Sequence, residues 1–417
     1  MISYTSTRGD NKKNTFSEAI LKGMAPDGGL FVPNKLPRFS LNELRKLSKK
    51  SYQERAVFIF NLFETNFSDD VIKKIVAQAY ASQFDIQNIT PVVHLKDNQY
   101  ILELWHGPTA AFKDIALQIM PLFFLEAIKK EKSNFRYLIL AATSGDTGKA
   151  ALEGYKDKEN ISAIVFYPNG KVSQLQQLQM QTQEGRNVSV YALLGGFDKV
   201  QTLVKDIFQD TAFNKKLLKK GIILSSANSI NWGRLIPQIV YHVSSYIDLV
   251  NQKVITFGDA IDVVVPSGNF GNLLAAFYAK KMGLPIRKFV CASNKNNVLT
   301  GFFQTGTYDI TNRSLSKTPS PSMDILIASN IERLLFLITN DAKQVSLWMR
   351  ELRTKKKFSV DSATKKILQE EFSADWVSNK ECLQNIKRIY DDTHYLMDPH
   401  TSIAQIVAER YSKREKV

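Results

Sequence analysis

The chain has 417 residues, of which 44% are hydrophobic, 23% charged and 11% aromatic. This composition is typical of a folded globular protein with a large core, and it excludes a disordered, collagen-like or coiled-coil chain. The 55 lysines and arginines outnumber the 40 aspartates and glutamates, and the formal net charge of +15 is compatible with nucleic acid, an anionic membrane or an anionic small molecule as a partner.

Residues 1–95 are predicted to form a separate N-terminal region of mixed structure. A turn rich in glycine and proline spans Met24–Pro33, and alternating helical patterns follow it up to about Gln83. The pattern then changes, so we place the first domain boundary near residue 95.

The segment Leu102–Asp114 leads from a strand through a Gly-Pro turn into an apolar helix, expected over Ile115–Ile128. This order puts Lys113 at or near the N-terminus of a helix, beside Phe112 and small alanines. The helix dipole and burial both disfavour a charged amine there, so we expect a lowered pKa for Lys113. A neutral amine is what Schiff-base chemistry requires.

From about Tyr100 onward, short apolar strands alternate with helical segments, which predicts βαβ units and buried parallel sheet. Because the pattern occurs on both sides of residue 250, we predict an α/β protein with two parallel-sheet subdomains, over residues 96–250 and 251–417. After about Asp324 the chain is expected to be mostly helical, and Ser314–Ser322 is expected to be an exposed loop or lid. The expected strands are Tyr137–Ala142, Ile161–Phe166, Val188–Leu194, Ile261–Val265 and Arg287–Ala292.

Two of these strands meet a helix through a glycine-rich turn, at Thr143–Gly148 and at Ser267–Asn272. Free N–H groups and the positive end of a helix dipole make such turns suitable for an anion, although either turn alone is also explained as a tight connection. The first turn is not a nucleotide-binding P-loop, because Lys149 is followed by Ala150 rather than serine or threonine.

The segment His106–Asp114 resembles the lysine motif of the threonine synthases, which are pyridoxal-phosphate enzymes. Tyr4–Arg8 and Gly23–Gly29 resemble the N-terminus of the longer, bacterial and fungal type. Further segments resemble motifs of this family in the same order along the chain: Ser144–Gly148, Ala227–Arg234, Val265–Asn272, Pro321–Ile325 with Ala328–Arg333, and Asp398–Thr401. Several ordered matches make coincidence negligible.

The resemblance implies a fold-type II pyridoxal-phosphate enzyme similar to the tryptophan synthase β-subunit. It implies a lyase that converts O-phospho-L-homoserine and water into L-threonine and phosphate. Lys113 would hold the cofactor as a Schiff base, and the hydroxyl of Thr401 would bond its pyridine nitrogen. The cofactor phosphate would lie against Gly268, Asn269, Phe270, Gly271 and Asn272. The substrate would meet Thr143, Ser144, Gly145, Asp146 and Thr147 with its carboxylate, and Asn228, Ser229 and Arg234 with its phosphate.

Asp146 departs from the pattern of shorter relatives, in which an asparagine faces the cofactor's ring oxygen. An aspartate would put a second anion there unless a cation balances it or the side chain points elsewhere. A further departure is Ser402, where the family frequently has alanine.

Rival functions remain open at this point. A lyase acting on a phosphorylated amino alcohol, or a dehydratase, would use the same lysine and glycine-rich turns, although Arg234 favours a phosphorylated substrate. An RNA-binding protein would show a basic stripe with interleaved aromatics, but the basic residues are scattered in short clusters. His106 and His400 are expected to shape their turns, and no cluster of ligands predicts a metal.

Partners and location follow from what the sequence lacks. No apolar stretch reaches about 18 residues and the N-terminus carries no signal-peptide pattern, so we predict no membrane as a partner. The scattered basic clusters predict no nucleic acid as a partner. Cys291 and Cys382 are the only cysteines, which fits a reducing cytoplasm. We expect a monomer or a homodimer.

Overall fold

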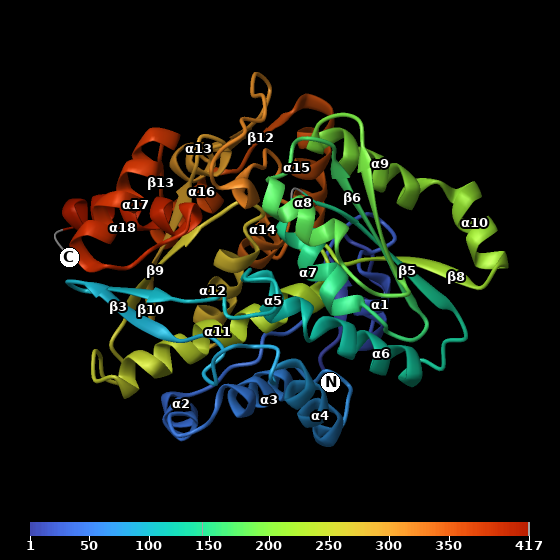
Figure 1. The fold of residues 1–417 in the computed structure, drawn as a ribbon, viewed down its shortest axis with the longest axis horizontal. Coiled ribbons are helices and arrows are strands. Elements are labelled where there is room, and N and C mark those ends of the chain that lie inside the picture. Colours follow the sequence, from blue (N-terminus) through green and yellow to red (C-terminus); the bar gives the residue numbers. More distant parts are fainter. Residues whose placement is uncertain (144, 416–417) are drawn as a thin grey trace.

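Two parallel sheets form the centre of the molecule (Figure 1), and the computed structural model describes residues 1–143 and 145–415. The first sheet has the strand order β7-β6-β5-β8 and is formed by β5 (Arg136–Ala142), β6 (Ile161–Pro168), β7 (Val188–Leu193) and β8 (Ile222–Ser226). The second sheet has the order β13-β10-β9 and is formed by β9 (Ile261–Pro266), β10 (Ile286–Ser293) and β13 (Phe372–Trp376).

All neighbouring strands in both sheets are parallel, which confirms the predicted α/β class. Each of the five predicted strands is present, but β8 and β13 were missed. The expectation of a mostly helical C-terminal part was incomplete, because β13 supplies an outer strand of the second sheet. Three antiparallel pairs are formed by β1 (Tyr4–Ser6) with β2 (Phe31–Pro33), β3 (Val92–Lys96) with β4 (Gln99–Leu102), and β11 (Thr307–Asp309) with β12 (Lys357–Ser359).

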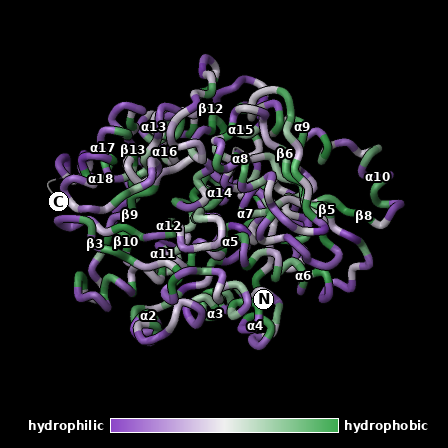
Figure 2. The backbone as a smooth tube through the Cα atoms, viewed as in Figure 1, coloured by the Kyte–Doolittle hydropathy of each residue, from purple (hydrophilic) through white to green (hydrophobic). Residues whose placement is uncertain are grey.

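Helices cover both faces of each sheet, as the side-chain alternation of the strands requires. In β10, Val290 and Ala292 pack against α18 (Pro399–Glu415), whereas Phe289 and Cys291 enter the main core on the other face. Figure 2 shows hydrophobic residues concentrated along the central strands such as β5 and β6. The helices around the sheets are α7 (Asp146–Tyr155), α8 (Gln174–Gln181), α9 (Phe197–Gln209), α10 (Thr211–Lys219), α11 (Trp232–Asn251), α12 (Gly271–Met282), α13 (Val298–Thr305), α14 (Ile331–Thr339), α15 (Ala342–Lys355), α16 (Ser362–Glu371) and α17 (Asn379–Thr393).

The N-terminal region packs its helices under α11 (Figure 1) and is also tied to the second half of the chain. Thr7 and Arg8 donate to the buried carboxylate of Glu332, with contacts of 2.6 to 2.9 Å. The helices of this region begin at serine or threonine caps, three of which form capping boxes. They are α1 (Phe16–Lys22), α2 (Leu41–Leu47), α3 (Tyr52–Leu62) and α4 (Asp69–Ala79).

The helix expected over Ile115–Ile128 is instead broken into α5 (Lys113–Leu117) and α6 (Met120–Lys130). Pro121 causes the break, because its ring cannot donate to Leu117 and would clash with that carbonyl in a continuous helix. The carbonyl of Leu117 lies against Gly154, where a Cβ would come within 2.0 Å of it. The short helix α5 is therefore free to direct Lys113 independently of α6.

The segment Ser314–Ser322 is a loop, as expected, but it is exposed only in part: Ser314 and Lys317 are exposed, whereas its other residues are buried or half-buried. Thr318 and Ser320 are buried, and the carboxylate of Asp324 accepts from the hydroxyl and the backbone N–H of Thr318. Asn294 also donates to Asp324 at 2.9 Å. These bonds pin the loop and the 3-10 helix η1 (Pro321–Met323) that follows it against the second sheet.

No helix within residues 1–143 and 145–415 combines the length and the apolar character that a membrane span requires. The predicted boundaries at residues 95 and 250 remain predictions, although each parallel sheet falls entirely on one side of residue 250.

Candidate active site

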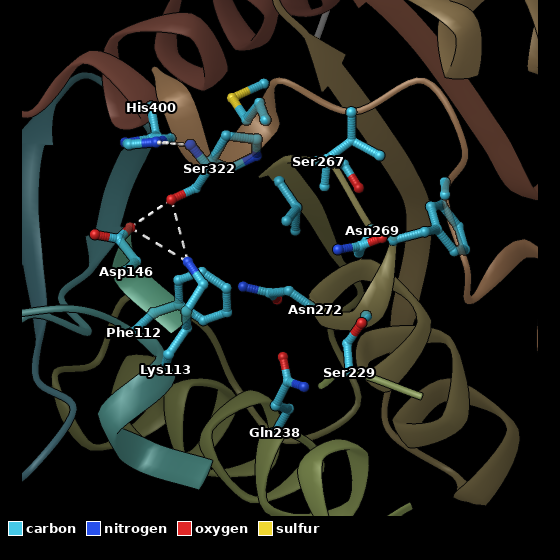
Figure 3. Close-up of a pocket in the computed structure, with 18 of the residues that line it drawn as sticks. Phe112, Lys113, Asp146, Ser229, Gln238, Ser267, Asn269, Asn272, Ser322 and His400 are labelled. Atoms are coloured by element: carbon cyan, nitrogen blue, oxygen red, sulfur yellow. Dashed lines mark hydrogen bonds and ion pairs between the residues drawn. The ribbon is translucent and has the colours of Figure 1, made fainter. Parts of the chain in front are cut away.

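A cavity of about 2590 Å³ opens between the carboxyl ends of the strands of the two sheets. The turns after β5, β8 and β9 all reach it, as is usual for open parallel sheets. Every predicted site residue within the described part of the chain lines this cavity except Gly145, and Ser144 lies outside the described residues. Figure 3 shows Lys113 in the cavity, with Asp146 and Ser322 on one side of it and Asn269 and Asn272 on the other.

Lys113 is buried, and it is the first residue of α5, as predicted. Its Nζ lies 3.2 Å from Oδ2 of Asp146 and donates to the hydroxyl of Ser322 at 3.1 Å (Figure 3). Burial lowers the pKa of Lys113, and the charges of Arg234 and Lys149 also lower it, while Asp146 opposes them. The lowered pKa inferred from the sequence is confirmed, and it favours the neutral amine that bonds to a carbonyl carbon.

Asp146 is held by two cations and two neutral donors. Lys113 lies on Oδ2, and Lys149 Nζ lies 3.5 Å from Oδ1. Gln176 donates to Oδ1 at 2.6 Å and the hydroxyl of Ser322 donates to Oδ2. Burial alone would raise the pKa of Asp146, but Lys113 and Lys149 outweigh it and hold the pKa well below its usual range. The carboxylate is therefore ionised and balanced.

The side chain of Thr143 closes the turn in which it lies. The hydroxyl of Thr143 accepts from the N–H groups of Gly145 and Gly148, both at 2.9 Å. Gly145 has φ of 141°, and a Cβ on it would come within 2.1 Å of the Gln176 side chain. The turn presents Asp146 and Thr147 to the cavity, while the Thr143 hydroxyl serves the turn itself.

The turn Ser267–Asn272 leads directly into the N-terminus of α12. Phe270 adopts the left-handed conformation, with φ of 62°, just before the helix begins. Asn272 is fixed by His242, whose Nε2 donates to the carbonyl and the side-chain oxygen of Asn272. Burial lowers the pKa of His242 to about 4, so this histidine is neutral. Backbone N–H groups at the start of a twelve-residue helix favour an anion.

Replacing Gly268 by alanine is expected to disturb this turn. The new Cβ would lie 2.8 Å from the carbonyl oxygen of Ser322 and 3.1 Å from Cα of Met323, so backbone must move. Overpacking of this kind costs about 1–3 kcal/mol, and we expect that loss in the free energy of unfolding, measured by denaturant titration. Gly271→Ala is the matched control, because its nearest neighbour would lie at 3.4 Å. Equal stability of the two variants would contradict the explanation.

Arg234 is a buried arginine without an ionic partner. Its guanidinium donates to the carbonyl of Ala227 at 2.6 Å, while Nε is buried with no hydrogen-bond partner. No carboxylate of the described chain forms an ion pair with it. Burial lowers the pKa of Arg234 to about 10, so it is still charged at neutral pH. A buried cation that faces a cavity without a partner is suited to an anionic ligand.

The neighbouring residues Asn228 and Ser229 also line the cavity. Oδ1 of Asn228 is buried without a partner. The carbonyl of Ser229 accepts from Arg333 and Asn330, at 3.3 and 3.4 Å. The fully buried Arg333 thus fixes the loop that carries the predicted substrate residues.

Thr401 lies in the first turn of α18 and lines the cavity. Its hydroxyl donates to Asp398 at 2.5 Å. His400 Nδ1 lies 2.7 Å from the same carboxylate, and its Nε2 accepts from the backbone N–H of Ser322, which assigns the Nδ1–H tautomer. Burial alone would raise the pKa of Asp398, but His400 and Thr401 outweigh it and lower the pKa to about 2. His400 thus orients this turn, as expected.

The predictions missed several residues of the site. Ser322 lies within the motif Pro321–Ile325, for which the sequence predicted no role. Nothing in the sequence around Gln176 and Lys149 distinguishes these two residues from ordinary surface residues. His106 is buried between the carboxylates of Asp85 and Glu103, at 2.6 and 2.8 Å, and holds the turn before Lys113. No group of three or more histidine, cysteine, aspartate or glutamate side chains in the described ranges is arranged for a metal.

Two family profiles match the sequence. One described as "Threonine synthase N terminus" matches residues 3–80, and one described as "Pyridoxal-phosphate dependent enzyme" matches residues 84–369. Together they cover the N-terminal region and most of both sheets.

Curated relatives and solved structures agree with these profiles. The chain is 46% identical over 405 residues to human threonine synthase-like 1, an alignment that covers 95% of this chain and 54% of the human protein, so the chain spans about half of that relative. It is 39% identical over 432 residues to threonine synthase of Schizosaccharomyces pombe, with 96% and 82% covered. The crystal structure of threonine synthase from Brucella melitensis with bound pyridoxal phosphate superposes with a TM-score of 0.89 at 36% identity, covering 98% of this chain and 86% of that one.

Proposed function

Because the chain belongs to the threonine synthase family of pyridoxal-phosphate-dependent enzymes, we propose that it converts O-phospho-L-homoserine and water into L-threonine and phosphate. The observation that carries this proposal is Arg234, a buried guanidinium that lines the same cavity as Lys113 and lacks an ionic partner. A substrate with its own phosphate requires an anion site apart from that of the cofactor.

The residues present fit pyridoxal phosphate. Lys113 offers a buried amine with a lowered pKa, which suits a covalent bond to the cofactor aldehyde. The turn Ser267–Asn272 offers the backbone N–H groups of a helix N-terminus for the cofactor phosphate. When bound, the cofactor withdraws electrons from the α-carbon of the attached amino acid.

Lys113 is the proposed proton carrier. When its Nζ is not bonded to the cofactor, Lys113 would take and return protons within the cavity. Ser322 and Asp146 hold that Nζ in place, since both bond it directly. Arg234 would bind the substrate phosphate and stabilise it as it leaves, with Asn228 and Ser229 beside it. The turn Thr143–Thr147 is proposed to receive the substrate carboxylate at its backbone N–H groups.

Incubation of the protein, loaded with pyridoxal phosphate, with O-phospho-L-homoserine tests the proposal. We expect L-threonine and inorganic phosphate in equal amounts, measured by chromatography and a phosphate assay. A 2-oxo acid with ammonia would instead identify the alternative, a lyase or dehydratase of the same fold. No reaction with a loaded cofactor would contradict the proposed substrate.

We also propose that the protein acts in the cytoplasm as a monomer or a homodimer. The two cysteines are both buried and unpaired, which is consistent with a reducing compartment. Size-exclusion chromatography with light scattering measures the oligomeric state, and a mass above that of a dimer would contradict it.

A further inference from the structure

Lys149 is a buried cation in the cavity that the proposed reaction does not use. It is the fourth residue of α7, only 6% of its surface is exposed, and it lines the cavity. Its Nζ has a carboxylate within reach, Oδ1 of Asp146 at 3.5 Å. Lysine is rarely this buried unless it is paired.

The position of Lys149 is unfavourable for a lysine on general grounds. It lies in the first turn of α7, where the positive end of the helix dipole repels a cation. Asp146 begins the same turn, three residues earlier, so the two side chains share one face of the helix. The ion pair with Asp146 is what compensates for both the burial and the dipole.

The charges around Asp146 show what Lys149 contributes. Lys113 and Lys149 both lie on its carboxylate, while Gln176 and Ser322 are neutral donors. If Lys113 gives up a proton and becomes a neutral amine, Lys149 is the cation that remains in contact with Asp146. Without it, a buried carboxylate would have only neutral partners, which is strongly unfavourable.

We propose that Lys149 is a positioning residue, which keeps Asp146 ionised and fixed in orientation when Lys113 gives up its positive charge. The proposal rests on the proposed function, because only a lysine that bonds the cofactor has to become neutral.

The variant Lys149→Met tests the proposal in the cofactor-free protein. We would measure the reactivity of Lys113 toward limiting acetic anhydride as a function of pH, with mass spectrometry of the peptide that contains it. Only the neutral amine reacts, so the midpoint of the profile reports its protonation.

The sign of the expected shift follows from the groups that face Lys113. Burial, Arg234 on α11 and Lys149 on α7 lower its pKa, whereas Asp146 raises it. One further carboxylate lies in the surroundings, that of Asp114 on α5, which is also influenced by Lys149, while the ring of His400 on α18 is bonded to Asp398 and to the backbone of Ser322. In Lys149→Met, Lys113 is the lysine that remains in contact with Asp146, so the carboxylate stabilises the charged form of Lys113 more strongly. The midpoint should therefore rise by about one pH unit, and reactivity at a fixed pH below the midpoint should fall about tenfold.

Three further variants make the experiment specific. Lys149→Arg keeps the charge and should leave the midpoint near that of the parent protein. Lys156→Met removes a half-exposed lysine at the end of the same helix, paired with Glu153, and should have no effect. In an Asp146→Asn background, Lys149→Met should shift the midpoint by much less than in the parent chain, because the carboxylate is gone.

Two results would overturn the inference. One is an unchanged midpoint in a Lys149→Met protein whose thermal unfolding shows an intact fold. The other is an equal shift with and without Asp146, which would mean that Lys149 acts on Lys113 only through direct repulsion and not through Asp146. Neither readout needs cofactor or substrate, so a failure of the proposed threonine synthesis is detected separately, by the product assay.

Discussion

Replacing Lys113 by alanine is expected to abolish threonine formation and the visible absorbance band of the lysine-bound cofactor. The amine of Lys113 contacts Asp146 and Ser322, and alanine at this position leaves no amine there. Turnover should fall to the background of the assay, because both the covalent attachment and the proton carrier are lost.

The fold should survive this change. Lys149 remains on Asp146, so the buried carboxylate keeps a cation and is not left uncompensated. Thermal unfolding within a few degrees of the parent protein is the expected control result. Lys317→Ala is a matched variant, since Lys317 is an exposed lysine that lines the same cavity, and it should retain activity. A Lys113→Ala protein that kept the band and made threonine would refute the assignment.

Replacing Arg234 by methionine should lower kcat/KM for O-phospho-L-homoserine by about a hundredfold or more. Charge-assisted hydrogen bonds contribute about 1.5–3 kcal/mol each, and a guanidinium can make two of them to one phosphate. Because the phosphate is also the leaving group, kcat should fall as well as KM rise. The absorbance of the bound cofactor should stay normal, since the cofactor phosphate is proposed to bind elsewhere, at Ser267–Asn272.

The thermal stability of Arg234→Met distinguishes a role of Arg234 in phosphate binding from a purely structural role. Arg234 has no ion pair within the described chain, so methionine, which keeps much of the packing, should leave thermal unfolding nearly unchanged. Arg333→Met provides the contrast, because that arginine donates to the carbonyls of Phe31, Ser229 and Ile230 and should lose stability. Unchanged affinity for O-phospho-L-homoserine in well-folded Arg234→Met would exclude a role in phosphate binding.

The parts of the fold that could be predicted are those with a local signal. Apolar runs such as Tyr137–Ala142 identified five strands, because strands buried on both faces contain few polar residues. The sequence around Lys113 also indicated that this lysine begins a helix and is buried among small apolar residues, and burial lowers its pKa. β13 was missed because its residues, Phe372–Trp376, alternate with polar side chains and form a strand only through pairing with the distant β10.

The residues of the site that escaped prediction depend on contacts between distant segments. Ser322 reaches Lys113 across 209 positions of the chain, and it does so because Asp324 and Asn294 pin the preceding loop. Gln176 reaches Asp146 from a separate helix, over 30 positions. No local pattern contains this information, and for that reason a loop expected to be an exposed lid forms part of the wall of the cavity.

The contact of Thr7 and Arg8 with Glu332 has a consequence for synthesis of the chain on the ribosome. These partners are separated by 325 and 324 positions, so Thr7 and Arg8 are synthesised long before Glu332. The first parallel sheet is complete once Ser226 has emerged, whereas the second also has to await Phe372–Trp376. Domains generally fold as units during synthesis, and closure of long loops slows folding. We therefore expect a nascent chain in which the first sheet forms early, while the second sheet, the cavity and the contacts of Thr7 and Arg8 with Glu332 are completed late.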